Sequence, residues 1–102
     1  MKSDVIRSVF LDELERNKRL ISRYEKEIEN LPKGSIFKRK IGTSEYIYLN
    51  YREGKKVISK FIGKTEAIDL TELNEKIIHR KELQALIRKL KREQKELEKE
   101  LK

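Results

Sequence analysis

The sequence contains no cysteine, one proline, one histidine and four glycines, and it has no long hydrophobic run. Without cysteine there is no disulfide, no thiolate metal site and no cysteine nucleophile. No segment approaches the roughly 18 apolar residues that a transmembrane helix needs. The first residues reach acidic side chains after one short apolar cluster, so we expect no signal peptide, no membrane partner and a cytoplasmic protein.

The scarce residue types also argue against catalysis. His79 is the only histidine, so a metal site is not expected and a position on a helix surface is the simpler interpretation. The four glycines have the spacing of neither a P-loop nor a dinucleotide-binding loop, and they are better explained as turn residues. Carboxylate pairs such as Glu13 and Glu15 fall on charged helix faces. We therefore expect no enzymatic activity, no metal and no cofactor.

The chain is rich in charge and poor in apolar residues. Of its 102 residues 36% are hydrophobic and 43% are charged, so a single domain over residues 1–102 will have a thin core. Such a chain folds as long helices with a narrow apolar stripe or gains stability by oligomerising.

Two segments have helical hydrophobic spacing, residues 4–31 and 70–101. Each contains a heptad seam typical of a coiled coil, and one polar residue interrupts each seam. A buried polar residue there fixes register or partner number; the alternative is a seam open to solvent. The helices are expected to pack on each other, within one chain or in a homodimer. The seams consist of Phe10, Leu14, Asn17, Ile21, Tyr24, Ile28 and Leu31, and of Leu83, Ile87, Leu90, Gln94, Leu97 and Leu101.

Between the helices, residues 35–62 are predicted to form a β-meander with strands at 35–41, 45–51 and 55–62. Three-residue loops, 42–44 and 52–54, would pair Ile41 with Glu45 and Tyr51 with Lys55. The fold class is α+β: a three-stranded antiparallel sheet with both helices packed together on one of its faces. This register predicts a core face of Phe37, Ile41, Ile47, Leu49, Tyr51, Val57 and Phe61. It places Lys38, Lys40, Tyr46, Tyr48, Lys56, Ile58 and Lys60 on the opposite face.

The net charge of +8 is concentrated in the same segment. Residues 31–64 hold nine Lys/Arg against two Glu, together with all four glycines and five of the seven aromatic residues. A concentrated positive field with aromatic side chains is typical of a polyanion-binding face. Arg39 would point toward the core side, at the rim, where a helix carboxylate could pair with it. The predicted nucleic-acid-binding residues are Lys38, Lys40, Tyr46, Tyr48, Arg52, Lys55, Lys56 and Lys60. A protein-binding face and a merely solvated face are the alternatives.

Three stretches, Leu31–Ile36, Tyr46–Gly54 and Lys55–Gly63, resemble a widespread bacterial and phage family of short proteins with the motif LPKGSI…YREG…K[YF]IG. The resemblance implies a helix, a three-stranded module and a second helix, and it implies no particular activity. Residues 34–39, the Tyr-rich second strand, Gly54–Lys56 and Lys64–Ala67 are also similar to the arm-type (AP2-like) DNA-binding domain of tyrosine recombinases. That similarity implies a sheet laid into the major groove. This sequence differs by having no recombinase catalytic domain and by adding a long N-terminal helix, a candidate for dimerisation or partner binding.

Together these features predict a small non-catalytic protein of a phage or mobile element that binds DNA or RNA through its basic β-meander. Two alternatives stay open. One is a phage-encoded inhibitor of a host defence effector, such as a CRISPR nuclease, that binds the protein or its guide RNA. The other is an oligomeric adaptor that uses its helix seams.

Overall fold

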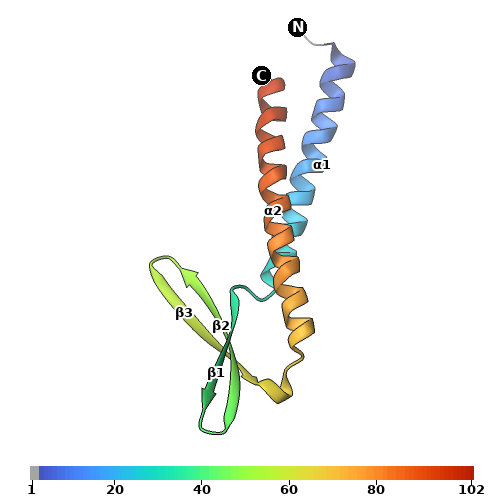
Figure 1. The fold of residues 1–102 in the computed structure, drawn as a ribbon. Coiled ribbons are helices and arrows are strands. Elements are labelled where there is room, and N and C mark those ends of the chain that lie inside the picture. Colours follow the sequence, from blue (N-terminus) through green and yellow to red (C-terminus); the bar gives the residue numbers. More distant parts are fainter. Residues whose placement is uncertain (1–2) are drawn as a thin grey trace. The chain divides into compact units, whose positions relative to one another are not determined.

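The computed structural model describes residues 3–102 and has the predicted α+β element order (Figure 1). Helix α1 (Asp4–Glu29) precedes three antiparallel strands, β1 (Ser35–Ile41), β2 (Ser44–Glu53) and β3 (Lys56–Lys64). A single 3₁₀ turn, η1 (Thr65–Ala67), then leads into helix α2 (Leu70–Glu100). The two helices contact each other, as predicted. That both helices also cover one face of the sheet stays a prediction.

The chain divides into two compact units that share α2. Residues 1–30 and 82–102 form the helical unit, and residues 31–81 form the sheet unit. The helical unit is an antiparallel pair, with the start of α1 beside the end of α2 (Figure 1). There the Arg7 guanidinium donates a hydrogen bond of 3.1 Å to the Leu101 carbonyl.

The core of the helical unit comes from the predicted seams. Ile21, Ile87 and Leu90 are buried together, and three half-buried side chains pack against them. Because the spacing alternates between four and three residues, one stripe of each helix faces the other helix along its length. In the structure the seams of α1 and α2 therefore pack against each other within one chain. The half-buried side chains are Leu20, Tyr24 and Ile28.

Asn17 shows how the polar interruption of the α1 seam is accommodated. Its side chain is 4% exposed, and its Nδ2 donates a 2.8 Å hydrogen bond to the Leu90 carbonyl. A seam open to solvent is thus the wrong interpretation at this position. Because the bond joins one turn of α1 to one turn of α2, it favours a single register of the two helices.

The sheet unit has the strand order β1-β2-β3, and both of its hairpins are tighter than predicted. Ile41 pairs with Ser44 and Glu53 pairs with Lys56, so each loop has two residues rather than three. Gly42 and Gly54 come first in these loops with φ of 64° and 62°, while no non-glycine residue among those described has positive φ. Positive φ at the first loop residue alone is the pattern of a type II′ turn, whose twist matches that of the strands. The predicted register is therefore wrong by one residue in both hairpins.

The buried hydrophobic residues of the sheet unit are Ile47 at 0%, Leu49 at 2% and Ile77 at 5% exposure. Ile47 and Leu49 alternate along the central strand, so both point to the same face of the sheet. The start of η1 is attached to β2, since the Thr65 hydroxyl donates a 3.2 Å hydrogen bond to the Glu45 carbonyl. These contacts define one covered face of the sheet.

The loop that enters β1 approaches β2 closely at Gly34. This residue has φ of 102°, and a Cβ there would collide with the Asn50 carbonyl. Only glycine fits both the conformation and the space. On the same loop the Lys33 ammonium lies 4.6 Å from the centre of the Tyr51 ring, a cation–π contact.

Candidate nucleic-acid interface

The observed register redistributes the predicted site residues over both faces of the sheet. Residues directly opposite in an antiparallel ladder share a face. The face with Ile47 and Leu49, here called the core face, consists of Ile36, Lys38, Lys40, Glu45, Ile47, Leu49, Tyr51, Glu53, Lys56, Ile58 and Lys60. The other face, here called the aromatic face, consists of Ser35, Phe37, Arg39, Ile41, Ser44, Tyr46, Tyr48, Asn50, Arg52, Val57, Ser59, Phe61 and Lys64.

The predicted combination of lysines and tyrosines on one face is therefore wrong. Lys38, Lys40, Lys56 and Lys60 share the core face, whereas Tyr46, Tyr48 and Arg52 lie on the aromatic face. Lys55 belongs to neither, because it occupies the second position of the β2–β3 turn.

The observed register gives the core-face lysines neighbours that the sequence did not indicate. Lys38 is directly opposite Ile47, and Lys60 is directly opposite Leu49. Both lysines are exposed on edge strands, so their aliphatic stems can cover the buried pair while the ammonium groups stay in water. The other two lysines have acidic neighbours, since Lys40 is opposite Glu45 and Lys56 is opposite Glu53.

The aromatic face is organised in rows that cross the three strands. In one row Tyr46 of β2 lies between Arg39 of β1 and Lys64 of β3. In the next row Tyr48 lies between Phe37 and Phe61. A β-bulge on β3 separates these rows, because Ile62 has no partner between Phe61 and Gly63. The result is a basic–aromatic–basic row beside a row of three aromatic rings.

Further along β2 the face becomes polar and then basic again. The third row contains Asn50 and Ser59, and the Ser59 hydroxyl donates a 2.6 Å hydrogen bond to the Asn50 side-chain oxygen. In the fourth row Arg52 is opposite Val57. The aromatic rows are thus bounded by cationic side chains in both directions along the sheet.

On the aromatic face the Phe61 ring contacts the rings of Tyr46 and Tyr48. The Phe61 ring centre is 5.6 Å from that of Tyr48, with an edge-to-face tilt of 67°, and 6.0 Å from that of Tyr46. Such contacts hold rings in defined orientations. Even so, Phe37 is 48% and Phe61 is 55% exposed. An exposed apolar patch on a small protein is typical of an interaction surface.

The charges of residues 31–64 are distributed unequally between the two faces. Both acidic side chains, Glu45 and Glu53, lie on the core face with four lysines. The aromatic face has three cations, Arg39, Arg52 and Lys64, and no acid. The aromatic face therefore presents the less compensated positive charge.

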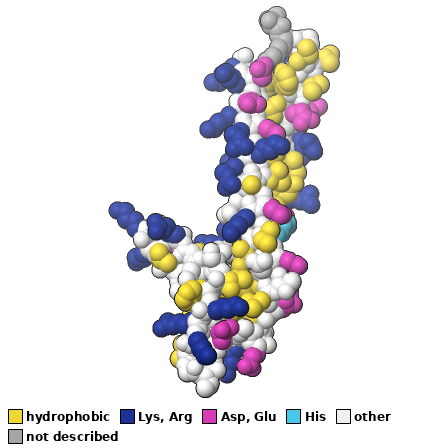
Figure 2. All heavy atoms as spheres, in the orientation of Figure 1, with side chains coloured by type: hydrophobic (Ala, Val, Ile, Leu, Met, Phe, Trp, Pro, Cys, Tyr) yellow, Lys and Arg dark blue, Asp and Glu magenta, His cyan; other side chains and the backbone are white. Residues whose placement is uncertain are grey.

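The β2–β3 hairpin adds a basic end to the sheet. Arg52, Lys55 and Lys56 are all exposed there. Figure 2 shows Lys and Arg side chains gathered at this hairpin, with hydrophobic side chains visible on the sheet beside it.

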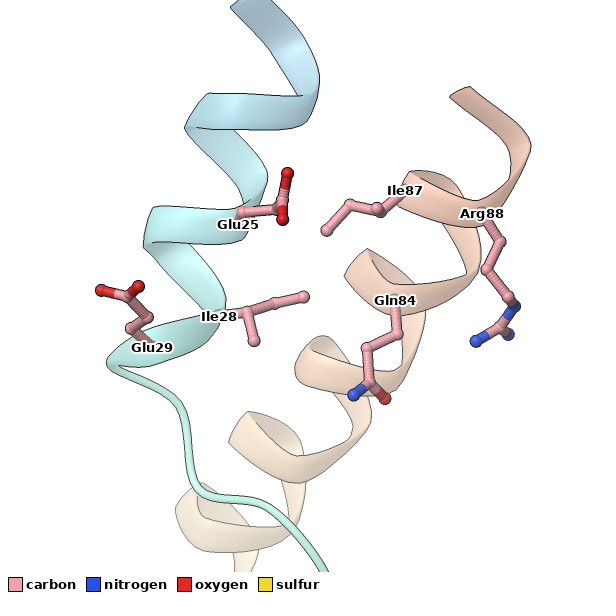
Figure 3. A pocket seen from close by; sticks show the side chains of 6 residues that line it. All are labelled: Glu25, Ile28, Glu29, Gln84, Ile87 and Arg88. Atoms are coloured by element: carbon pink, nitrogen blue, oxygen red, sulfur yellow. The ribbon is translucent and has the colours of Figure 1, made fainter. Parts of the chain in front are cut away.

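Two hollows lie between the helices of the helical unit. In Figure 3 Ile28 of α1 and Ile87 of α2 point toward each other across the first, which Glu25, Glu29, Gln84 and Arg88 also line. Its two apolar lining residues belong to the predicted hydrophobic seams. The second hollow has an apolar floor and an acidic rim, and is lined by Val9, Phe10, Glu13, Glu93, Glu96, Leu97 and Glu100.

Among residues 3–102, no helix combines the length and the apolar character of a membrane span. The same residues bring no three His, Asp or Glu side chains together in a group suited to a metal ion. His79 is half-buried on α2.

The predicted site lacked four cationic or aromatic residues of the aromatic face: Phe37, Arg39, Phe61 and Lys64. The prediction had buried Phe37 and Phe61 and had turned Arg39 toward the core. A signal for the correct register was present in the dipeptides Gly42-Thr43 and Gly54-Lys55, because glycine followed by another residue is typical of a two-residue type II′ turn.

Comparison with known proteins identifies the family. Residues 10–72 match a family described as a domain of unknown function (DUF6788), and the chain belongs to this family. The match runs from Phe10 in α1 through the whole sheet to the first turn of α2. No curated protein and no solved structure matches the chain.

Proposed function

We propose that this protein is a non-catalytic nucleic-acid-binding protein and that the aromatic face of its β-meander is the binding surface. One observation carries the proposal: the basic–aromatic–basic row of Arg39, Tyr46 and Lys64 lies beside the exposed aromatic row. Cationic side chains contact phosphates, and exposed rings stack on bases. A face that offers both and has no acidic residue fits DNA or RNA.

Electrostatics assigns different roles to the two faces. Arg39, Arg52 and Lys64 are placed for direct phosphate contacts. The core-face lysines and Lys55 add to the net charge of +7 over residues 31–64, which attracts a polyanion over a distance of about one Debye length, roughly 10 Å. The predicted site residues Lys38, Lys40, Lys56 and Lys60 thus contribute to the field, with fewer direct contacts than the cations of the aromatic face.

The resemblances found in the sequence support a place for this protein in a phage or mobile element. The three motif stretches, which include Gly34 and Gly54, resemble the pattern of the bacterial and phage family. The similarity to the arm-type domain of tyrosine recombinases supports nucleic-acid binding by a three-stranded sheet.

The test is fluorescence anisotropy with labelled single-stranded DNA, duplex DNA and hairpin RNA at ~50 and ~300 mM salt. Three phosphate contacts to a single strand predict a roughly 40-fold loss of affinity over this range, from a slope of about −0.7 per contact. Absence of binding to every probe at the lower salt concentration would refute the proposal.

A second candidate function, protein binding, has support in the helical unit. The start of α1 exposes apolar side chains, with Val5 at 75%, Ile6 at 48% and Val9 at 53%. Beside them Glu13, Glu93, Glu96 and Glu100 line the second hollow, and Glu13 also forms an exposed 3.8 Å ion pair with Arg16. Carboxylates repel nucleic acid, so this patch fits a protein with basic and apolar side chains. Such a partner would suit an inhibitor of a host defence effector or an adaptor.

A homodimer fits the patch less well. A two-fold interface sets the same patch against itself, so the glutamates of two copies would face each other. We therefore expect a monomer in light scattering after size-exclusion chromatography. Capture of a protein partner after nuclease treatment, with loss of that partner in Val9→Glu, would support the second function. Capture that Val9→Glu leaves intact would contradict it.

A further inference from the structure

The row formed by Phe37, Tyr48 and Phe61 gives the proposed binding surface a specific chemistry. Three aromatic side chains lie side by side across three strands, at a strand spacing of roughly 4.8 Å. Two of the three are phenylalanines, which have no hydrogen-bonding group. The row can offer ring faces and edges, and its only polar atom is the Tyr48 hydroxyl.

We infer that this row is a base-stacking platform and that the natural ligand is single-stranded nucleic acid. The inference rests on the proposed function and specifies its substrate class. In a single strand the bases can turn away from one another and stack on side chains, whereas in a duplex both ring faces of each base are already covered. The flanking cations, Arg39 and Lys64 on one side and Arg52 on the other, then contact the phosphates of the same strand.

The same residues fit a duplex poorly. Reading a major groove requires donors and acceptors directed at base edges. On either side of Tyr48 this face instead has Phe37 and Phe61, each about half exposed. If this face docked against a duplex backbone, the rings would lie against phosphates and sugars. Burial of their apolar surface there would contribute little binding free energy. Docking in the major groove, which the recombinase resemblance implies, thus disagrees with the observed register.

Charge complementarity distinguishes a single strand from an apolar protein partner. The cations bracket the rings along the sheet: Arg39 and Lys64 belong to the row before the aromatic row, and Arg52 lies two rows beyond it. No acid shares the face. An apolar protein surface would leave these three cations without partners, whereas a strand that crosses the rows brings a phosphate for each base.

The deciding experiment compares four fluorescent probes with the full chain at one low salt concentration. These are a 12-nucleotide DNA strand, the RNA strand of the same sequence, the DNA duplex, and an abasic strand with the same phosphates and no bases. If at least two bases stack, the abasic strand binds at least about 25-fold more weakly than the DNA strand, because each stacked base contributes about 5- to 150-fold. The duplex is also expected to bind more weakly than either single strand.

A pair of variants tests the platform itself. Phe37→Leu with Phe61→Leu keeps apolar side chains at both half-exposed positions and removes the rings. This double variant should lose about 5- to 150-fold in affinity for the DNA strand per stacked base and bind the abasic strand as before. Leu11→Ala, at an exposed position of α1 outside the aromatic face, is the control, and it should leave both affinities unchanged.

Each result has a distinct meaning. Equal affinities for the strand, the duplex and the abasic probe would overturn the stacking platform and leave nucleic-acid binding standing. Binding to none of the four probes would overturn both. Phe37→Leu with Phe61→Leu that folds with the circular dichroism of the original chain and binds every probe equally well would also overturn the platform.

Discussion

Two matched double variants separate the faces of the sheet. Arg39→Gln with Lys64→Gln removes two positive charges that flank Tyr46 on the aromatic face. Lys38→Gln with Lys60→Gln removes two charges from the same two strands, on the core face. The net charge of +8 falls to the same value in both, so nonspecific attraction weakens equally. Only direct contacts can make the two variants differ.

The size of the difference follows from the number of phosphate contacts. With Arg39, Arg52 and Lys64 engaged, affinity for a single strand falls roughly 40-fold between ~50 and ~300 mM salt, and with Arg52 alone it falls roughly 3.5-fold. The slope of log affinity against log salt should thus decrease in magnitude by about 1.4 in the aromatic-face variant. The core-face variant should keep a slope close to the original.

The assay is anisotropy with a labelled 12-nucleotide strand at five salt concentrations, for the original chain and both variants. Circular dichroism checks that all three have the same helix content. The reasoning is refuted if the two double variants have the same slope. It is also refuted if Lys38→Gln with Lys60→Gln shows the larger change.

Three further predictions concern stability, and thermal unfolding followed by circular dichroism checks each. Ile47→Ala, at a site with 0% exposure, should lower the free energy of unfolding by about 2–5 kcal/mol. Val57→Ala, at 68% exposure, should change it by less than about 0.5 kcal/mol. Equal losses in the two variants would contradict the assigned faces. Gly34→Ala should destabilise more than Gly42→Ala, because both glycines have positive φ but only Gly34 lacks room for a Cβ; the reverse order would contradict the close approach to Asn50. Asn17→Asp sets a carboxylate against the Leu90 carbonyl and should lower the free energy of unfolding by about 3 kcal/mol or more at neutral pH. Asn17→Leu should leave it nearly unchanged. An Asn17→Asp variant as stable as the original chain would contradict the buried hydrogen bond.

The sequence was sufficient to predict the fold class. The predicted helix 4–31 is observed as Asp4–Glu29, and the predicted helix 70–101 as Leu70–Glu100. Spacings of three and four residues identify the helix stripe that becomes buried, and Ile21, Ile87 and Leu90 are indeed in the core. Periodicity of this kind extends over many residues, so one exception such as Asn17 does not hide it.

The predicted register of the sheet was wrong by one residue in both hairpins. The prediction assigned Phe37, Val57 and Phe61 to the core because apolar side chains are usually buried. In the structure they are about half exposed or more, and the core face is completed by exposed lysines at its edges. A shift of one residue exchanges every side chain between faces, so an error in loop length changes the whole site.

Tyr46 and Tyr48 share a face, as predicted, and Arg52 lies on that face as well. That residues 31–64, where the charge is concentrated, bind nucleic acid stays a prediction. Which lysines share the face of Tyr46 and Tyr48 depends on the number of residues in each turn, and a count of charges does not give that number. The division of α2 between two compact units likewise depends on packing across the chain, and local spacing carries no information about it.

The most direct test of the central claim is nuclear magnetic resonance of side chains during titration with a 12-nucleotide single strand. Aromatic carbons of Phe37, Tyr48 and Phe61 report on the aromatic face, and the methyl groups of Ile47 and Leu49 report on the core face. The account predicts large shift changes and contacts to base protons at the three rings, with small changes at the two buried methyl-bearing side chains. Changes concentrated at the Lys38 and Lys60 side chains, or in the helical unit, would contradict it.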